Sequence, residues 1–304
     1  MLNEPVAVVF PGQGSQKPGM AEHLVERALD LCARWMDRAS AILGWDVARM
    51  CSEGGASDLR RTSVTQPAVF TVSVITWRLL HRSGLRPSFV AGHSLGEYNA
   101  LVASGALDFS TGLELVVRRG ALMSEVHDGG LSAVVGSAAN EIADHLASGN
   151  FHEIDLANLN TYEQAVIGGP LEALGRAGAY LEERGVRVIP LQVSGPFHTR
   201  YMRKAATQFA PAVRAVNYGP LRVPVIANAV ARPYTQDEVG DLLVQQIDHS
   251  VRWLESVEYM LDHGVDDVIQ IGPGRVVSDM VRRIKKSYQR TQSVPAQTPT
   301  RRTT

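Results

Sequence analysis

Residues 91–98 read AGHSLGEY, a G-x-S-x-G pattern in which Ser94 stands between two glycines. Residues 88–91 are predicted to form a short strand, and the apolar run that begins at Tyr98 is predicted to form a helix. The two glycines let the strand and helix backbones approach closely while the serine side chain stays exposed. The bare pattern arises often by chance. Between a strand and a helix, however, it makes Ser94 a candidate nucleophile.

A second glycine-rich loop, FPGQGSQ at residues 10–16, follows an apolar run that is predicted to be the first strand. Backbone N–H groups in such a loop can bind an anion. A phosphate cradle would need a G-K-[ST] sequence, which is absent because Lys17 lies too close to Gly12. The loop instead suits an oxyanion hole, with one N–H from Leu95 and a second from Gln13. An ordinary strand-end turn is the simpler alternative.

A nucleophilic serine needs a base, and the sequence contains nine histidines. His198 lies in the turn SGPFHTR at residues 194–200, between a predicted strand and a predicted helix, where a side chain can project into a cleft. His93 is adjacent to Ser94, but neighbouring side chains point in different directions at such a turn. We therefore expect His198 to be the base and His93 to line the site.

In their order and spacing, these pieces resemble the malonyl-CoA:acyl carrier protein transacylases of fatty acid and polyketide synthesis, from about residue 5 to about residue 287. Within that family, the likeness is to discrete acyltransferases that serve polyketide synthases in trans. The other matching pieces are TQPA at 65–68, NLN at 158–160, RGALM at 119–123, FHTRYM at 197–202, VRW at 251–253 and GPG at 272–274.

The resemblance assigns the chemistry to two side chains. It implies that Ser94 attacks a thioester while His198 acts as the base. The backbone amides of Gln13 and Leu95 would hold the oxyanion. Gln246 would orient the imidazole through a carbonyl, so that the serine and the histidine form a dyad rather than a triad with an acidic residue.

The resemblance also implies which residues bind the acyl group. Arg119 would pair with the malonyl carboxylate, which a planar guanidinium can bind through two parallel charge-assisted hydrogen bonds. Phe197 stands where malonyl-specific members carry phenylalanine, and its bulk would reject an α-methyl branch by ~1–3 kcal/mol. His93 completes the predicted substrate-binding residues. The family often has Asn-Ser-Pro where Tyr162 and its neighbours stand, and a proline where Ser250 stands. We therefore expect the rim of the acyl and pantetheine site to differ.

The order of predicted strands and helices indicates an α/β fold. A hydrolase-like large subdomain with a parallel-sheet core is predicted at 1–129 and 196–287, and a small ferredoxin-like subdomain is predicted as an insertion at 130–195. Residues 288–304 are predicted to be a disordered tail. The alternative fold is a true α/β-hydrolase, in which several strands precede the nucleophile and an acidic residue lies between serine and histidine. Asp155 is the candidate for that acid.

Bulk properties narrow the class of protein. A chain of 304 residues that is 45% hydrophobic and 20% charged can bury a large core. Its net charge of −1 argues against general binding to nucleic acid or to a membrane surface. Cys32 and Cys51 lie outside any metal-binding pattern, and neither a signal peptide nor a membrane span is evident. We expect a cytoplasmic enzyme that uses no metal or redox cofactor.

The expected reaction is ping-pong transfer of a malonyl group from malonyl-CoA, a coenzyme A thioester, to the phosphopantetheine thiol of a holo acyl carrier protein. Basic residues at 275–290, together with Arg200, Arg203 and Lys204, are predicted to form a positive rim that steers an acidic carrier. A solvated helix face is the alternative for these charges. A proofreading acyl hydrolase would lack the carboxylate-binding arginine, and a carrier-docking module would lack the dyad. A transacylase of housekeeping fatty acid synthesis is a further alternative.

Overall fold

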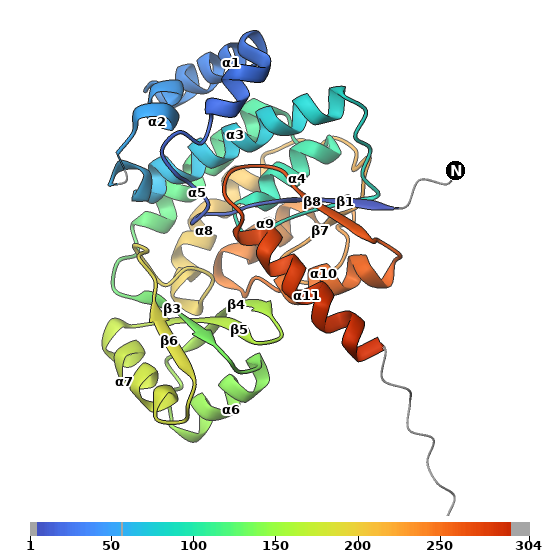
Figure 1. Cartoon of the computed structure of the whole chain (residues 1–304). Helices are drawn as coiled ribbons and strands as arrows, with labels where there is room; N and C mark the ends of the chain where they lie inside the picture. Colours follow the sequence, from blue (N-terminus) through green and yellow to red (C-terminus); the bar gives the residue numbers. More distant parts are fainter. Residues whose placement is uncertain (1–4, 56, 293–304) are drawn as a thin grey trace, which may run out of the picture.

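The computed structural model describes residues 5–55 and 57–292, which are built around two separate β-sheets (Figure 1). The larger part surrounds a parallel sheet of four strands, and the smaller part surrounds an antiparallel sheet of four strands. This arrangement agrees with the predicted hydrolase-like body and small ferredoxin-like insertion. None of the helices in the described ranges is long and apolar enough to cross a membrane.

The parallel sheet is buried on both faces, which explains why its first strand is apolar throughout. Alternate side chains of a strand point to opposite faces. Val8 and Phe10 therefore pack into the core on one side, whereas Ala7 and Val9 pack into the core on the other. The strands, in the order in which they pair, are β7 (Val225–Ile226), β2 (Phe89–Gly92), β1 (Val6–Phe10) and β8 (Asp267–Gln270).

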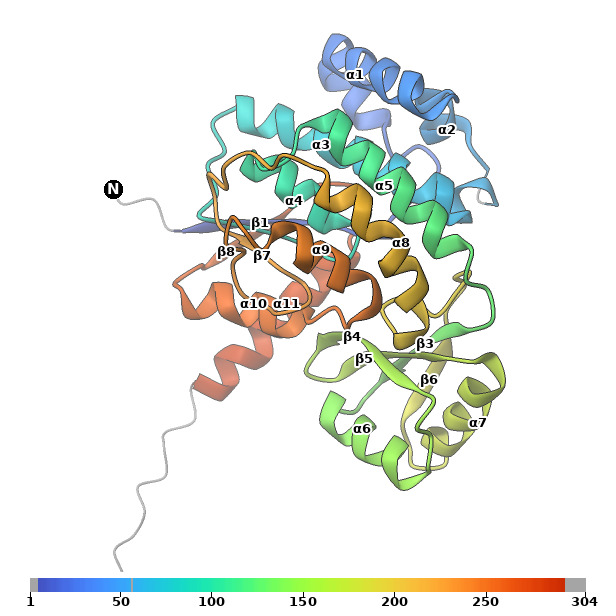
Figure 2. The ribbon, with the colours of Figure 1, turned by 180° about the vertical axis from the view of Figure 1, so that it is seen from behind.

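Helices cover both faces of this sheet (Figures 1 and 2). The larger core lies under α3 (Thr62–Arg82), α4 (Gly96–Ser104), α5 (Phe109–Ser124), α8 (Arg203–Arg214) and α9 (Val239–Asp248). An outer layer adds α1 (Glu22–Leu43) and α2 (Val47–Glu53), with the short 3-10 turns η1 (Asp58–Arg60) and η2 (Arg200–Met202) elsewhere. The opposite face carries α10 (Trp253–Asp262) and α11 (Val276–Gln292).

The smaller part has the βαββαβ order of a ferredoxin-like fold. Its sheet has the strand order β4-β5-β3-β6, and its two helices pack on one face. The other face turns towards the larger part, and Ala133 and Val166 on it line a cavity between the two. The elements are β3 (Gly130–Val135), α6 (Ala139–Ser148), β4 (Asp155–Thr161), β5 (Gln164–Gly169), α7 (Leu171–Glu182) and β6 (Arg187–Pro190).

A short β-bridge joins the two parts. Asn158 on β4 pairs in parallel with Val251, which precedes α10. The backbone of Val251 accepts a hydrogen bond from Leu159 and donates one to Ala157, each 2.9 Å long. The small sheet is thereby fixed against the segment that leads into α10, close to the cavity.

Some boundaries differ from the predicted ones. The strand predicted at 223–226 contains only Val225 and Ile226, because Pro224 has no N–H to donate to a neighbouring strand. The helix predicted from residue 235 begins at Val239. The helix α11 continues to Gln292, into the segment predicted as a tail, and the rest of that tail, 293–304, lies outside the described residues.

Candidate active site

Ser94 stands on a sharp turn between β2 and α4. Its backbone is left-handed, with φ of 51°, a conformation that is strained for a residue with a side chain. Both neighbouring glycines are required by close backbone contacts. A Cβ added at Gly92 would lie 1.9 Å from the carbonyl carbon of Gly96, and one added at Gly96 would lie 2.2 Å from the carbonyl oxygen of Phe10. The turn therefore presents Ser94 at the carboxyl end of the sheet, where ligands of open α/β sheets bind.

His198 lies within hydrogen-bond distance of this serine. Its Nε2 is 2.7 Å from Oγ of Ser94, and its Nδ1 is 2.7 Å from the backbone carbonyl oxygen of Gln246. A carbonyl can only accept, so Nδ1 carries the proton and Nε2 is free to accept one from the serine. Burial, and next the positive charge of Arg119, lower the pKa of His198 to about 3. The imidazole is therefore neutral and available as a base at neutral pH.

Arg119 extends from α5 to the same point and is only 1% exposed. Its Nη1 donates to Oε1 of Gln66, and its Nη2 donates to Oγ of Ser94 and to Oε1 of Gln246, each over 2.9 Å. A buried guanidinium keeps its charge, since arginine is not deprotonated in proteins. The arrangement places a fixed positive charge directly beside the hydroxyl group of Ser94.

Two backbone amides near Ser94 have no acceptor within the described residues. They belong to Gln13, in the loop after β1, and to Leu95, at the start of α4. The loop lies against the serine turn, because a Cβ on Gly12 would come within 2.6 Å of the His93 carbonyl oxygen. Free N–H groups at this position can stabilise an oxyanion.

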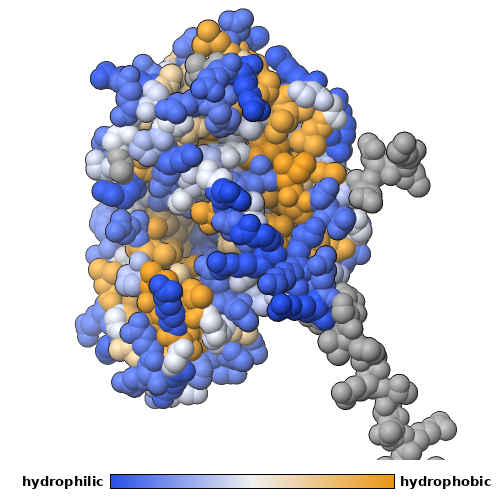
Figure 3. Space-filling view, viewed as in Figure 1, coloured by the Kyte–Doolittle hydropathy of each residue, from blue (hydrophilic) through white to orange (hydrophobic). Residues whose placement is uncertain are grey.

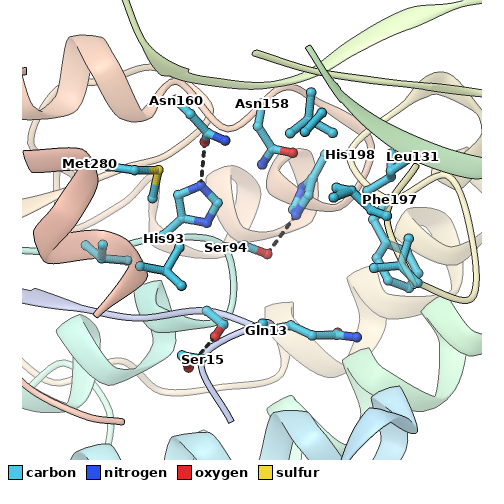
Figure 4. Close-up of a pocket in the computed structure, with 18 of the residues that line it drawn as sticks. Gln13, Ser15, His93, Ser94, Leu131, Asn158, Asn160, Phe197, His198 and Met280 are labelled. Carbon is cyan, nitrogen blue, oxygen red and sulfur yellow. Dashed lines mark hydrogen bonds between the residues drawn. The ribbon is translucent and has the colours of Figure 1, made fainter. Parts of the chain in front are cut away.

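Ser94, His198 and Arg119 line a cavity of about 630 Å³ between the larger and the smaller part (Figures 3 and 4). Figure 4 shows Ser94 and His198 facing each other. Phe197, which is 5% exposed, contributes to one wall. His93 lines the opposite side, where its Nε2 is 2.9 Å from Oδ1 of Asn160 on β4.

Four basic residues of the predicted positive rim form ion pairs. Arg200 is paired with Asp155, and Arg203 with Asp248 at 2.6 Å. On α11, Arg282 is paired with Asp279 and Lys285 with Asp266. Of the basic residues in the predicted rim, Arg283 lines the cavity, and Arg60 from η1 does so without having been predicted.

Asp155, the acid that a true α/β-hydrolase would need, is not part of the site. It accepts a 2.8 Å hydrogen bond from the backbone N–H of Arg200 as well as the ion pair with its side chain. Among the described residues, no carboxylate is bonded to His198, whose Nδ1 is occupied by the Gln246 carbonyl.

Two buried polar residues next to the Ser94 turn, Glu97 and Asn228, were not predicted as site residues. Glu97 is fully buried in the first turn of α4, and the side chain of Asn228, just after β7, accepts a 2.7 Å hydrogen bond from the backbone N–H of Ser94. Both have signals in the sequence. Glu97 is a charge at the start of an apolar helix, and Asn228 follows an apolar strand at the edge where sites form.

The family model for the acyl transferase domain matches residues 7–301. The chain belongs to this acyl transferase family. A relative from Bacillus velezensis, named polyketide biosynthesis malonyl CoA-acyl carrier protein transacylase BaeC, is 42% identical to this acyltransferase over 96% of this chain and 99% of that protein. The malonyl CoA-acyl carrier protein transacylase of Escherichia coli is 37% identical over 91% of this chain and 92% of that protein.

Solved structures share the fold. One is a malonyl-transacylase in complex with its holo acyl carrier protein from a type II polyketide synthase. It is similar to this acyltransferase with a TM-score of 0.89 and 35% identity, over 93% of each chain.

Proposed function

We propose that this acyltransferase moves a malonyl group from malonyl-CoA to the phosphopantetheine thiol of a holo acyl carrier protein. The observation that carries the proposal is the buried guanidinium of Arg119, 2.9 Å from the Oγ of Ser94. An acyl group on that oxygen would have a cation within reach of a terminal carboxylate, which acetyl groups lack and malonyl groups have. The relatives named as malonyl transacylases support the same substrate.

In the first half-reaction, His198 Nε2 takes the proton of Ser94 as its Oγ attacks the thioester carbonyl. The backbone amides of Gln13 and Leu95 stabilise the resulting oxyanion. When the tetrahedral intermediate collapses, the carbon–sulfur bond breaks. Coenzyme A leaves as a thiol after it receives the proton from His198, and malonyl-Ser94 remains.

The second half-reaction runs the same chemistry with a new nucleophile. His198 takes the proton of the phosphopantetheine thiol, and the sulfur attacks the ester carbonyl of malonyl-Ser94. Collapse returns the proton to Oγ of Ser94 and releases malonyl-carrier. Protein side chains and backbone amides carry each step, so we propose that malonyl-CoA is used as a substrate and that no cofactor is required.

We further propose that the carrier belongs to a polyketide synthase that this enzyme serves in trans. Identity to the relative named for polyketide biosynthesis is 42%, against 37% for the Escherichia coli transacylase. A cytoplasmic location is proposed with it, because Cys32 and Cys51 are both buried free thiols, the state that a reducing compartment maintains.

The test is intact-mass analysis of the purified protein after incubation with malonyl-CoA or acetyl-CoA, followed by addition of holo acyl carrier protein. We expect a malonyl adduct that is absent in the Ser94→Ala variant and that moves to the carrier. Release of free malonate or acetate without transfer, and without preference between the two donors, would instead identify a proofreading hydrolase. A carrier set from fatty acid and polyketide systems then distinguishes the two pathways by kcat/KM.

A further inference from the structure

One buried carboxyl group lies beside the dyad and takes no part in the steps above. Glu97 is 0% exposed, and its two oxygens receive hydrogen bonds from three donors. These are the backbone N–H of Asn228, at 2.9 Å, the phenol of Tyr234 and the side-chain amide of Gln246. Burial raises the pKa of Glu97 to about 7. A buried carboxyl group is costly unless it is hydrogen-bonded, and here its environment supplies donors on both oxygens.

Two of these donors also hold the backbone of Ser94. The Oδ1 of Asn228 accepts the Ser94 N–H at 2.7 Å, and its Nδ2 donates to the Gly92 carbonyl at 2.7 Å. The Nε2 of Gln246 donates to the Ser94 carbonyl at 2.7 Å. A left-handed backbone is strained for a non-glycine residue and persists only where surrounding contacts impose it. Glu97 accepts hydrogen bonds from both Asn228 and Gln246, the two residues that impose the left-handed backbone at Ser94.

The orientation of the Gln246 amide is set by the same carboxyl group. Its nitrogen faces Glu97 and the Ser94 carbonyl, so its oxygen faces Arg119 and accepts from Nη2 at 2.9 Å. A flipped amide would place an NH₂ group against the guanidinium, where two donors would face each other. Arg119 therefore depends on Glu97 for one of its acceptors.

We propose that Glu97 is a positioning residue that holds the Ser94 turn and the Arg119 guanidinium in their catalytic arrangement through Asn228 and Gln246. It touches no reacting atom. The part that concerns Arg119 rests on the proposed malonyl transfer, whereas the part that concerns the Ser94 turn applies to any acyl chemistry at that serine.

The variant Glu97→Gln tests this directly. It keeps the size of the side chain and one oxygen for Asn228 and Tyr234, but its NH₂ group faces the NH₂ of Gln246 and forces that amide to turn. We expect the rate of malonyl-Ser94 formation to fall about 100-fold, as for a misplaced catalytic group. We also expect the malonyl-to-acetyl ratio to fall. The matched control is Tyr234→Phe, which removes one donor to the same carboxylate, leaves the other two, and is expected to keep the wild-type rate and ratio.

A second readout does not depend on the acyl donor. A fluorophosphonate probe phosphonylates the activated serine with loss of fluoride, and its rate reports the Ser94 turn and the dyad even if the wild type transfers no malonyl group. Slower labelling of Glu97→Gln, with a melting temperature close to that of the wild type, supports the proposal. Labelling at the wild-type rate overturns it. Slower labelling with an unchanged malonyl-to-acetyl ratio overturns the part assigned to Arg119.

If circular dichroism shows that Glu97→Gln does not fold, Asn228→Ala carries the test. It removes the side-chain bonds from residue 228 to Ser94 and Gly92, through which Glu97 is proposed to act, while the backbone N–H that donates to Glu97 and the Gln246 link stay in place. A folded Asn228→Ala protein that reacts with the probe about tenfold more slowly, the effect expected when one supporting hydrogen bond is lost, supports the proposal. One that reacts at the wild-type rate overturns it.

Discussion

Replacing Arg119 by alanine should separate malonyl transfer from acyl transfer in general. The side chain is 1% exposed, and its Nη2 lies 2.9 Å from the Oγ of Ser94, which carries the acyl group in the proposed reaction. Removing one partner of a buried, hydrogen-bonded charge pair costs about 2–5 kcal/mol. At about 1.36 kcal/mol for each factor of ten, kcat/KM for malonyl-CoA should fall by about 30-fold to about 5,000-fold.

The acetyl group of acetyl-CoA has no carboxylate. For this donor, Arg119→Ala removes only the hydrogen bond from Arg119 to Ser94, which is worth about 0.5–1.5 kcal/mol. Most of the change should therefore appear in the malonyl-to-acetyl ratio. The assay is stopped-flow or quenched formation of acyl-Ser94 from each donor, followed by intact mass, with Arg119→Lys as the matched variant that keeps the charge but not the planar fork. Equal losses for the two donors would refute the carboxylate-binding role and leave Arg119 as a structural residue.

Four further changes test other parts of the site. Phe197→Val should raise the methylmalonyl-to-malonyl kcat/KM ratio by about 5-fold to about 150-fold, because the pocket side chain excludes an α-methyl group by ~1–3 kcal/mol; an unchanged ratio would place selectivity elsewhere. Burial lowers the pKa of His198 to about 3, so the free energy of unfolding of the wild type should fall as pH drops from about 6.5 towards 3. At pH 5 the loss should be about 2 kcal/mol relative to His198→Gln, measured by urea titration. Parallel pH curves for the two proteins would contradict this. Arg283→Glu should lower kcat/KM for the carrier about tenfold at low salt and little at high salt, whereas Arg282→Glu, at a position already paired with Asp279, should change it less. Gly96→Ala should abolish folding, because its Cβ would lie 2.2 Å from a backbone oxygen. The control Gly175→Ala, in open space on α7, should raise the unfolding free energy by about 0.5–1 kcal/mol. A folded Gly96→Ala enzyme would show that the turn can relax.

Sequence reasoning reached the turn at Ser94 because the signal is local. Two glycines four residues apart, between an apolar strand and a helix, specify a close strand–helix crossing. Arg119 and Gln246 were found through the family resemblance, since their distance from Ser94 in sequence gives no indication of contact. The structure brings them to the serine over 2.9 Å and 2.7 Å hydrogen bonds.

Contacts between distant segments account for what was missed. Asn228 lies 134 residues from Ser94, whose backbone N–H donates a hydrogen bond to its side chain. Only the pairing of β7 with β2 brings the two residues together. The ion pairs within the predicted positive rim were missed for the same reason. The aspartates that pair with Arg203 and Lys285 come from elements that the fold places beside them, and charge counted along one helix does not reveal them.

The small sheet begins at β3 and ends at β6, and these two strands are antiparallel neighbours. The inserted part therefore leaves the body and returns to it at nearly one place, while its contact with Val251 gives it a third anchor. Such an arrangement allows the part of the cavity wall that the insertion supplies to be exchanged as one unit. A foreign insertion that keeps the two adjacent ends and one strand matched to Val251 could be grafted here to reshape the acyl pocket, with the serine turn and its histidine left on their original scaffold.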